Sequence, residues 1–364
     1  SRVYASGVRI KILVHTCTTV RVHVYMMQNT TWTPVIDEGD EKIIMVSIVN
    51  KTYLNGFFIE NLFNDQVLNL PFPKKPKIIL SSHILNHSLT ALYTAKCLEQ
   101  GSKLFYGQHG GVYGQYAFTW REDHETKICN KYLTWGWSNK NNKNIYPFGI
   151  IKNIDKLKYS EENFSKSNNL LLVCRGRSRY EQKLNSSSGT NQFKTYIDDT
   201  IKFGSFLKED IRNNLIVRFH TRKYGWKEEE RWKKTFGSNI KLDWGDKPLD
   251  PIINSSRIVI CSYVGTTYLE TLPKNIPTIV YENFNDTLFR DEVLDDLEQL
   301  KDANILFKNP HEAAKFINEN WDNLKEWWLN EKTQKIISNF CNRYSKNNSN
   351  KLSDIINLIN REIE

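Results

Sequence analysis

The second half of the chain alternates short, continuous apolar runs with longer amphipathic segments. The apolar runs have the length of buried strands, and the segments between them have helical periodicity. The predicted strands are 170–174, 215–219, 240–242, 257–261, 277–281 and 305–307, and the predicted helices are 193–207, 248–254, 266–274, 285–301 and 311–328. This alternation predicts a parallel sheet with helices on both faces, a doubly wound α/β arrangement. Such sheets bind ligands outside the carboxyl ends of their strands, so polar motifs there are the first candidates for a site.

The first half is less regular but contains runs of the same kind. Strands are predicted at 77–80, 103–106 and 132–135, further strands at 10–14, 20–25 and 42–49, and a helix at 89–98. A polar, Asn-rich stretch at 159–169 directly precedes the strand at 170–174 and is the predicted interdomain linker. We therefore predict an N-terminal α/β domain over 1–160, a C-terminal α/β domain over 161–345 with a cleft between the two, and a C-terminal helix over 346–364.

The net charge and the cysteine content limit which ligands and metal sites the chain is expected to have. Lysine and arginine number 50 against 41 acidic residues, a net charge of +9, which suits an anionic ligand or membrane surface as well as an ordinary lysine-rich surface. No nucleic-acid module accompanies the charge, so we expect no nucleic-acid partner. Six cysteines without a CxxC pair predict reduced, buried thiols and no zinc site. We expect a cytoplasmic protein, with at most peripheral contact at the inner face of the membrane, and the first residue, Ser1, suggests a missing start.

A glycine-rich loop directly follows the predicted strand at 103–106. Its residues are Gly107, Gln108, His109, Gly110, Gly111, Val112, Tyr113 and Gly114. Glycine lets a backbone approach a ligand closely, and successive amides can form an anion nest. His109 is the one side chain of this loop that can exchange a proton near pH 7. The alternative is a tight turn in which the histidine has only a capping role.

A second loop of small residues follows the predicted strand at 257–261. Gly265, Thr266 and Thr267 place amides and hydroxyls at the start of a helix, which is an arrangement that binds phosphate. Glu270 follows within the first turn, where a carboxylate can accept hydrogen bonds from ribose hydroxyls. A capped helix with a stabilising first-turn glutamate would show the same pattern without any ligand.

Two further strand ends are basic. Arg218 and His220 lie at the end of the strand at 215–219, and Arg175 and Arg177 follow the strand at 170–174. Arginine and histidine in such positions suit a phosphate, a diphosphate or an acidic sugar. Solvated basic turns are the alternative in both cases. Elsewhere, the spacing of His83 and His87 lacks the glutamate and third ligand of a metal site, so we predict no metal.

Together these segments resemble a bacterial family of transferases in surface-polysaccharide biosynthesis, whose members are similar to GT-B glycosyltransferases. The matching segments are FYGQHGGVYG (105–114), YLTWGW (132–137), RKYGW (222–226), SSRIVICSYVGTTYLETLPKNIPTI (255–279) and the pair WW (327–328). The resemblance covers about residues 77–345, and residues 1–75 match poorly. The N-terminal, acceptor-side domain is therefore expected to be truncated or divergent.

The resemblance implies two Rossmann-like domains facing each other across a cleft, with a nucleotide-sugar donor held mainly by the C-terminal domain. The QHG element is also similar to the His–Gly loop of transferases that build glycerophosphate polymers, where the histidine is the base. By that likeness His109 is the base and His220 steadies the donor phosphate. Gly265, Thr266 and Thr267 would hold the phosphate, and Glu270 the ribose. Without a DxD motif, the likeness implies a metal-independent reaction and no cofactor besides the donor.

The implied reaction moves a glycosyl group from a nucleotide sugar to a polysaccharide or lipid-linked glycan acceptor. Two alternatives stay open at this point. One is a glycerol- or ribitol-phosphate polymer transferase that uses the same His–Gly loop on a phosphate electrophile. The other is a non-catalytic protein that binds a sugar or a polyanion in a degenerate cleft.

Overall fold

The computed structural model describes residues 2–5, 8–11, 24–28, 31–35, 72–84, 88–152, 154–180, 186–187 and 189–363. The strand predicted at 42–49 lies outside the described residues, as does His87. The chain divides into two compact units, residues 1–105 with Ile363 and residues 106–362 with Glu364. Each unit is described by itself below.

The described part of the first unit contains short strands and a helix. Its described elements are β1 (Arg2–Ala5), β2 (Val8–Lys11), β3 (Val24–Gln28), β4 (Thr31–Val35), β5 (Ile78–Ser81), α3 (Ser88–Glu99) and the start of β6 (Lys103–Gly107). β1 pairs with β2 and β3 with β4, both antiparallel. Tyr93 and Cys97 of α3 form a small core with Phe72 and Ile79.

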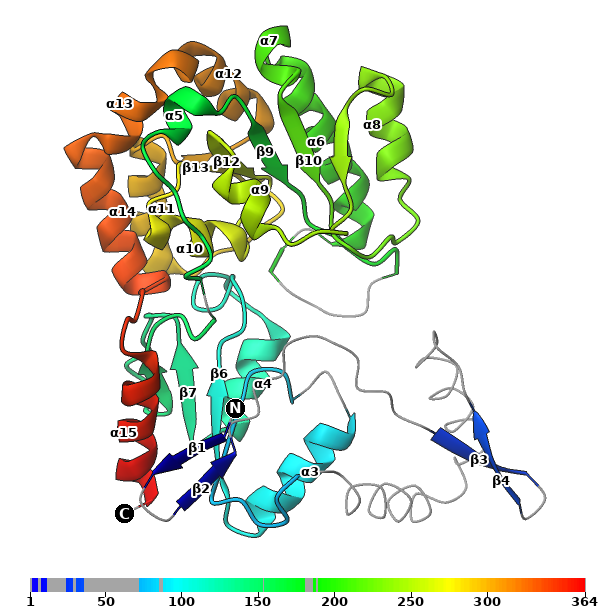
Figure 1. The fold of residues 1–364 in the computed structure, drawn as a ribbon, viewed down its shortest axis with the longest axis vertical. Coiled ribbons are helices and arrows are strands. Elements are labelled where there is room, and N and C mark those ends of the chain that lie inside the picture. Colours follow the sequence, from blue (N-terminus) through cyan, green and yellow to red (C-terminus); the bar gives the residue numbers. More distant parts are fainter. Residues whose placement is uncertain are drawn as a thin grey trace. The chain divides into compact units, whose positions relative to one another are not determined.

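A six-stranded, all-parallel sheet forms the centre of the second unit (Figure 1). Its strands are β9 (Leu170–Val173), β10 (Leu215–Arg218), β11 (Lys241–Asp243), β12 (Ile258–Cys261), β13 (Thr278–Tyr281) and β14 (Leu306–Phe307). They lie in the order β11-β10-β9-β12-β13-β14. This is the 3-2-1-4-5-6 order of the Rossmann fold, and the direction of winding reverses between β9 and β12. β9, β12 and β13 are buried along their whole length, as continuous apolar runs predict.

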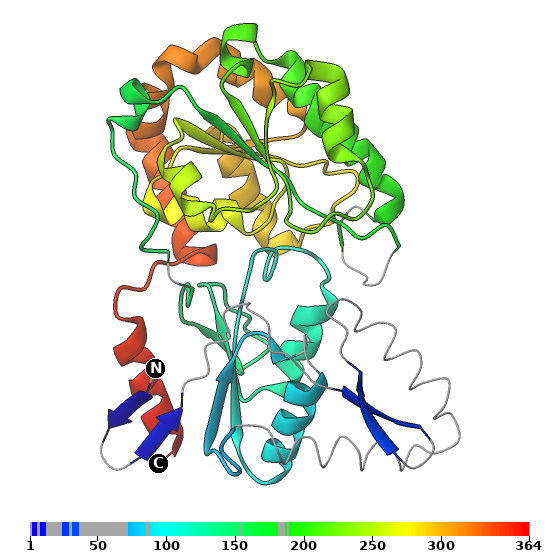
Figure 2. The same ribbon diagram turned by 45° about the vertical axis from the view of Figure 1, so that its right-hand side comes forward.

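Helices lie on both faces of this sheet (Figure 2). The longer ones are α6 (Phe193–Phe206), α8 (Glu228–Phe236), α11 (Asp291–Asp302), α12 (Pro310–Asn320) and α14 (Glu331–Tyr344). Shorter helical segments are α5 (Asn163–Lys166), η2 (Thr190–Gln192), α7 (Glu209–Arg212), α9 (Asp250–Asn254), α10 (Thr267–Thr271), η3 (Leu272–Lys274), η4 (Trp321–Asn323) and α13 (Leu324–Leu329). The α/β class and the doubly wound parallel sheet predicted from the sequence are confirmed.

A second sheet has the strand order β5-β6-β7-β8, and the boundary between the two units falls within β6. β7 (Lys131–Thr134) and β8 (Ile145–Pro147) are parallel, and α4 (Trp120–Ile128) precedes them. After α14 the chain returns to this region. The amide of Lys346 donates to the carbonyl of Trp135 over 2.8 Å, and α15 (Lys351–Ile363) then lies beside β7, with Glu362 3.5 Å from Lys131 (Figure 1).

Two predicted helices differ from the observed ones for tertiary reasons. The segment predicted as a helix at 311–328 divides into α12, η4 and α13, and at the end of α12 Arg257 donates to the carbonyl of Trp321 over 2.8 Å. The segment predicted at 285–301 becomes helical only at Asp291. Before that it runs along residues 115–117, where the amide of Arg290 donates to Gln115 and Leu288 accepts from Ala117. The predicted domain boundary at 160 is not tested by these observations and stays a prediction.

Candidate active site

The ends of β9 and β12 meet where the winding of the six-stranded sheet reverses, which is where Rossmann folds bind their ligands. Ser262 ties the two ends together, since its amide and its hydroxyl both donate to the carbonyl of Val173, over 3.1 and 3.0 Å. The hydroxyl of Tyr196 lies 2.6 Å from Ser262 Oγ and accepts from the amide of Arg175 over 2.7 Å. Because the Ser262 proton is directed at Val173, Tyr196 is the donor to Ser262.

Arg175 is held at this junction by aromatic rings. Its guanidinium carbon lies 4.6 Å from the ring centroid of Tyr196 and 5.8 Å from that of Tyr263. A cation over aromatic faces keeps its charge while the rings restrict its position. The sequence motifs that begin at Arg175 and at Ser262 are therefore adjacent, as their place in a parallel sheet predicts.

The buried side chain of Gln108 holds the glycine-rich loop 107–114 in place by hydrogen bonds. Gln108 Nε2 donates to the carbonyl of Gly110 over 2.7 Å, and Oε1 accepts from the Trp135 amide and the Trp137 indole over 2.9 and 2.8 Å. Gly114 has a φ of +72°, and its amide donates to Glu122 over 2.8 Å. Gly107 ends β6. Gln108 and Gly114 therefore stabilise the conformation of the loop through hydrogen bonds within the protein.

The loop at 107–114 contacts the loop at 262–267 directly. The amide of Gly111 donates to Thr266 Oγ1 over 2.9 Å, and a side chain at Gly111 would overlap the carbonyl of Gly265. Tyr116 donates to the carbonyl of Val264 over 2.9 Å, and Tyr268 donates to the side chain of Gln115. Two motifs that the sequence places in different halves of the chain thus form one surface within the second unit.

His109 lies beside a cavity of about 290 Å³ at this junction. The cavity is lined by His109, Gly110, Gly111, Val112, Tyr113, Thr119, Trp120, Arg121 and Thr266. Arg121 Nη1 is 2.9 Å from His109 Nε2, and the Tyr113 hydroxyl is 3.2 Å from Nδ1 and 3.5 Å from Nε2. Arginine only donates hydrogen bonds, so Nε2 carries the lone pair of the imidazole in this arrangement. That lone pair is what a proton-accepting role at the cavity requires.

Glu125 lies behind Tyr113 and is only 1% exposed. Its Oε2 accepts from Tyr132 over 3.0 Å, and its Oε1 accepts from Tyr113 over 3.5 Å. Burial raises the pKa of the Glu125 carboxyl to about 7, although hydrogen bonds from Tyr132 and the charge of Arg121 act in the opposite direction. Desolvation also raises the pKa of the Tyr113 phenol far above its ordinary value, which keeps this hydroxyl protonated.

Glu270 is buried on α10 and is paired with Lys152, whose Nζ lies 2.6 Å from Oε1. Burial raises the pKa of the Glu270 carboxyl, and the charge of Lys152 opposes that shift. Thr267 begins α10, and its carbonyl accepts from the hydroxyl of Thr271 over 3.1 Å. The role of Glu270 as a ligand contact stays a prediction, and its partner Lys152, which comes from the loop that follows β8, was not identified from the sequence.

The remaining predicted residues lie at the ends of β9 and β10. A Cβ on Gly176 would be 2.6 Å from Cβ of His220, so these two basic motifs are neighbours. Desolvation by surrounding groups, followed by the charge of Arg222, lowers the pKa of His220, although part of this side chain is open to solvent. The carbonyl of Arg177 accepts from the Trp226 indole over 2.8 Å. Arg218 instead forms a buried ion pair with Asp243.

Several residues of the junction were missed by sequence reasoning. Arg290 Nη2 lies 2.5 Å from Glu122 Oε1 and its Nε donates to the carbonyl of Tyr116 over 3.0 Å. Glu282, at the end of β13, is buried and accepts from the amide of Val264 over 2.8 Å. Its position directly after a predicted strand is the one sequence feature that could have indicated it. No group of three potential metal ligands occurs among the described residues.

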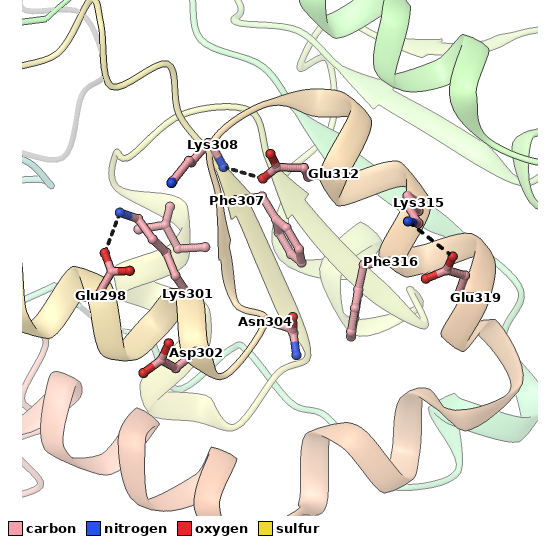
Figure 3. Close-up of a pocket in the computed structure, with 11 residues that line it drawn as sticks. Glu298, Lys301, Asp302, Asn304, Phe307, Lys308, Glu312, Lys315, Phe316 and Glu319 are labelled. Atoms are coloured by element: carbon pink, nitrogen blue, oxygen red, sulfur yellow. Dashed lines mark hydrogen bonds and ion pairs between the residues drawn. The ribbon is translucent and has the colours of Figure 1, made fainter.

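A larger hollow of about 400 Å³ lies elsewhere on the same unit, between α11, β14 and α12 (Figure 3). Lys301 lies 2.8 Å from Glu298, and Lys315 lies 3.9 Å from Glu319. Two of the three lysines that line the hollow are thus paired with glutamates of the same surface, and none of the predicted site residues lines it. We therefore place the candidate site at the cavity beside His109.

The sequence of residues 37–359 matches the model of the LIC12162 family transferase. The chain belongs to this family and is a transferase. The likeness to a transferase family that the motifs suggested is thereby confirmed. None of the helices in the described part of the chain has the length and apolar character that a membrane span requires. No curated protein matches the sequence.

Solved structures with a similar fold have low sequence identity. A putative UDP-N-acetylglucosamine 2-epimerase from Listeria monocytogenes has 14% identity and a TM-score of 0.48, over 84% of this chain and 77% of that one. MnaA from S. aureus, in a co-structure with UDP, has 11% identity and a TM-score of 0.47, over 88% and 82%. The wall teichoic acid polymerase TagF has 12% identity and a TM-score of 0.46, over 79% and 72%.

Proposed function

We propose that this transferase moves a glycosyl group from a nucleotide-activated donor to a hydroxyl of a surface-polysaccharide or lipid-linked glycan acceptor. The contact between Gly111 and Thr266 carries the proposal, because it joins the histidine loop to the loops at the Rossmann switch point. The proposed proton acceptor and the proposed nucleotide-binding loops both belong to the second compact unit.

The donor side of the site is formed by the ends of β9, β10 and β12. Arg175, the amides of Gly265–Thr267 and the Glu270–Lys152 pair supply cationic and polar groups for phosphate and ribose. Arg177 and His220 extend this surface, since Gly176 packs against His220. Arg218 would act indirectly, because its charge is matched by Asp243.

In the proposed reaction, the acceptor hydroxyl takes the place of Arg121 as the donor to His109 Nε2. The hydroxyl proton passes to Nε2 as its oxygen attacks the anomeric carbon, and the bond from that carbon to the nucleotide phosphate breaks. The leaving phosphate carries away the electron pair and is stabilised by the cationic groups around it. Because protein cations fill this role, we expect turnover to continue in the presence of a metal chelator.

The proposal is tested by a donor screen followed by the His109→Gln variant. One nucleotide sugar should raise the melting temperature, since a ligand that binds only the folded state stabilises it by mass action. His109→Gln should then lower turnover by roughly 10²–10⁴-fold. The dissociation constant of the donor should stay within about twofold of the wild-type value, because the donor contacts come from other loops.

Two outcomes would overturn this proposal. Near-normal turnover of His109→Gln with a verified acceptor would exclude the base role. Stabilisation by CDP-glycerol or CDP-ribitol and by no nucleotide sugar would instead support phosphate-polymer transfer by the same histidine loop. A variant at the exposed His311, which is outside the site, is the matched control for loss of a histidine.

A further inference from the structure

The cavity beside His109 has an apolar wall that the proposed reaction does not use. The volume of this cavity, about 290 Å³, lies at the lower end of the range for ligand pockets, roughly 300–1,000 Å³. Such a space suits a single sugar ring and is small for a whole nucleotide sugar. Two apolar side chains of its lining, Val112 and Trp120, are partly exposed to solvent. A ligand in the cavity would therefore meet an apolar surface next to the proposed base.

Arg121 connects the indole of Trp120 to this base. The guanidinium carbon of Arg121 lies 5.3 Å from the centroid of the Trp120 ring, and its Nη1 lies 2.9 Å from His109 Nε2. One flat polar group thus stacks on the indole and directs an N–H at the histidine. A sugar ring can make the same two contacts, because its C–H face packs on an aromatic ring while a hydroxyl at its edge donates a hydrogen bond. The guanidinium therefore marks the place that an acceptor sugar would take.

Trp120 has a defined position because it is the first residue of α4. The preceding residue, Thr119, caps this helix, and its hydroxyl accepts from the amide of Glu122 over 3.2 Å. The phenol ring of Tyr113 also lines the cavity, but it is only 3% exposed and its hydroxyl lies 3.5 Å from the buried Glu125. Of these two rings, Trp120 presents the aromatic surface that a ligand can reach.

Val112 has a backbone conformation that a valine rarely adopts. Its φ is +71°, and the other non-glycine positions with a positive φ among the described residues are Lys227, Asn275 and Asn304. A β-branched side chain is strained in this region, whereas glycine and asparagine adopt it at less cost. The loop contains four glycines, yet position 112 carries valine. Strain of this kind is concentrated at active sites and ligand-binding loops, so it points to a use for the valine side chain.

We infer that this cavity is an acceptor subsite for a sugar ring, whose C–H face packs on Trp120 and Val112 while one hydroxyl reaches His109 Nε2. This assignment rests on the proposed function for the identity of the base, and it adds the chemical class of the acceptor. A cyclic sugar has an apolar ring face, whereas an open-chain glycerol or ribitol phosphate has none. Trp120 and Val112 therefore determine specificity for a ring acceptor and take no part in proton transfer.

Saturation-transfer-difference NMR with simple probes tests the subsite. The probes are the methyl pyranosides of glucose, galactose and N-acetylglucosamine, with glycerol 3-phosphate and ribitol 5-phosphate as open-chain counterparts. Saturation should pass to the ring C–H protons of at least one pyranoside. This signal should fall by about fivefold or more in Trp120→Ala, whereas Trp120→Phe keeps an aromatic face and should retain most of it. Phe118→Ala, at a residue that is 43% exposed and lies outside the cavity lining, is the matched control and should leave the signal unchanged.

Variants of Val112 separate a ligand contact from a structural role. Val112→Gly relieves the strained φ but gives the unfolded chain more freedom, so the melting temperature should stay within about 3 °C of the wild-type value. The dissociation constant of the pyranoside should nonetheless rise about threefold or more, because part of the apolar wall is lost. Val112→Ile keeps a branched apolar side chain and should keep the wild-type dissociation constant. Unchanged pyranoside binding by Val112→Gly would exclude Val112 from the subsite.

The outcomes for this subsite are separate from those for the proposed function. Absence of saturation transfer to every pyranoside, or pyranoside signals that Trp120→Ala leaves unchanged, would overturn the inference even if His109→Gln loses turnover. Normal turnover of His109→Gln would overturn the proposed base role. Pyranoside binding that depends on Trp120 would support the subsite even in that case.

Discussion

The amide of Gly111 donates to the hydroxyl of Thr266 over 2.9 Å, across a separation of 155 residues in the sequence. This bond joins the loop that carries His109 to the loop that ends β12. The hydroxyl of Thr266 therefore binds the protein's own backbone.

Thr266→Val should weaken this junction, because valine keeps the shape of threonine but cannot accept from the Gly111 amide. A buried amide without a partner costs about 1–3 kcal/mol of unfolding free energy. Chemical denaturation followed by tryptophan fluorescence would measure it. Thr266→Ser retains the hydroxyl and should lose much less, and equal losses for the two variants would contradict the importance of this bond.

Gly111→Ala should disrupt the site more strongly than Gly110→Ala. An added Cβ at Gly111 would overlap the backbone carbonyl of Gly265, whereas one at Gly110 would lie 3.0 Å from the side-chain oxygen of Thr266. A backbone neighbour must move with its whole loop, but a side chain can rotate. We therefore expect Gly111→Ala to lose donor binding in isothermal titration, and Gly110→Ala to keep most of it. The reverse order would show that the loops are not packed as described.

Arg290→Ala should be strongly destabilising, because it leaves the buried Glu122 carboxylate without its cation. Breaking one side of such a pair costs about 3–5 kcal/mol. The exposed pair Lys127–Asp123 on the same helix provides the control, and Lys127→Ala should cost no more than about 0.5 kcal/mol. Thermal and urea unfolding of both variants would check the contrast, and a small loss for Arg290→Ala would mean that Glu122 is hydrated.

Glu125 should make the wild-type protein less stable as the pH rises. Its pKa is about 7 in the folded protein against 4.5 as the reference value, so the folded state binds the proton more tightly. The stabilisation is complete below about pH 4.5, declines as the pH rises to about 7, and is absent above that. At roughly 1.4 kcal/mol per pH unit, this interval corresponds to about 3 kcal/mol.

Glu125→Gln removes the titrating group and serves as the comparison for this pH dependence. The difference in unfolding free energy between wild type and variant should shift in favour of the variant between pH 5 and pH 8. Other titrating groups are common to both proteins and cancel in the difference. A difference that stays constant across this range would mean that Glu125 is ionised throughout, as an exposed glutamate would be.

The sequence pointed to individual residues of the site but not to the contacts between them. Gly111 and Thr266 were both identified, because each lies directly after a predicted buried strand. Their contact was not predicted, and neither was the pairing of Glu270 with Lys152. Arg121 and Arg290 were also missed. An arginine on a helix, or directly before one, looks the same in sequence whether its side chain faces solvent or a buried carboxylate.

The sequence by itself determined the strands and helices of the second half and the parallel sheet that they form. Those features follow from local apolar periodicity, which each segment carries regardless of its neighbours. Only the tertiary structure decided that residues 288–290 run along 115–117 instead of belonging to a helix, and that Arg218 is paired with Asp243. It also decided which side chains surround His109. Such contacts depend on the strand order, because the strand order brings distant loops to one edge of a sheet. Local periodicity carries no information about that order.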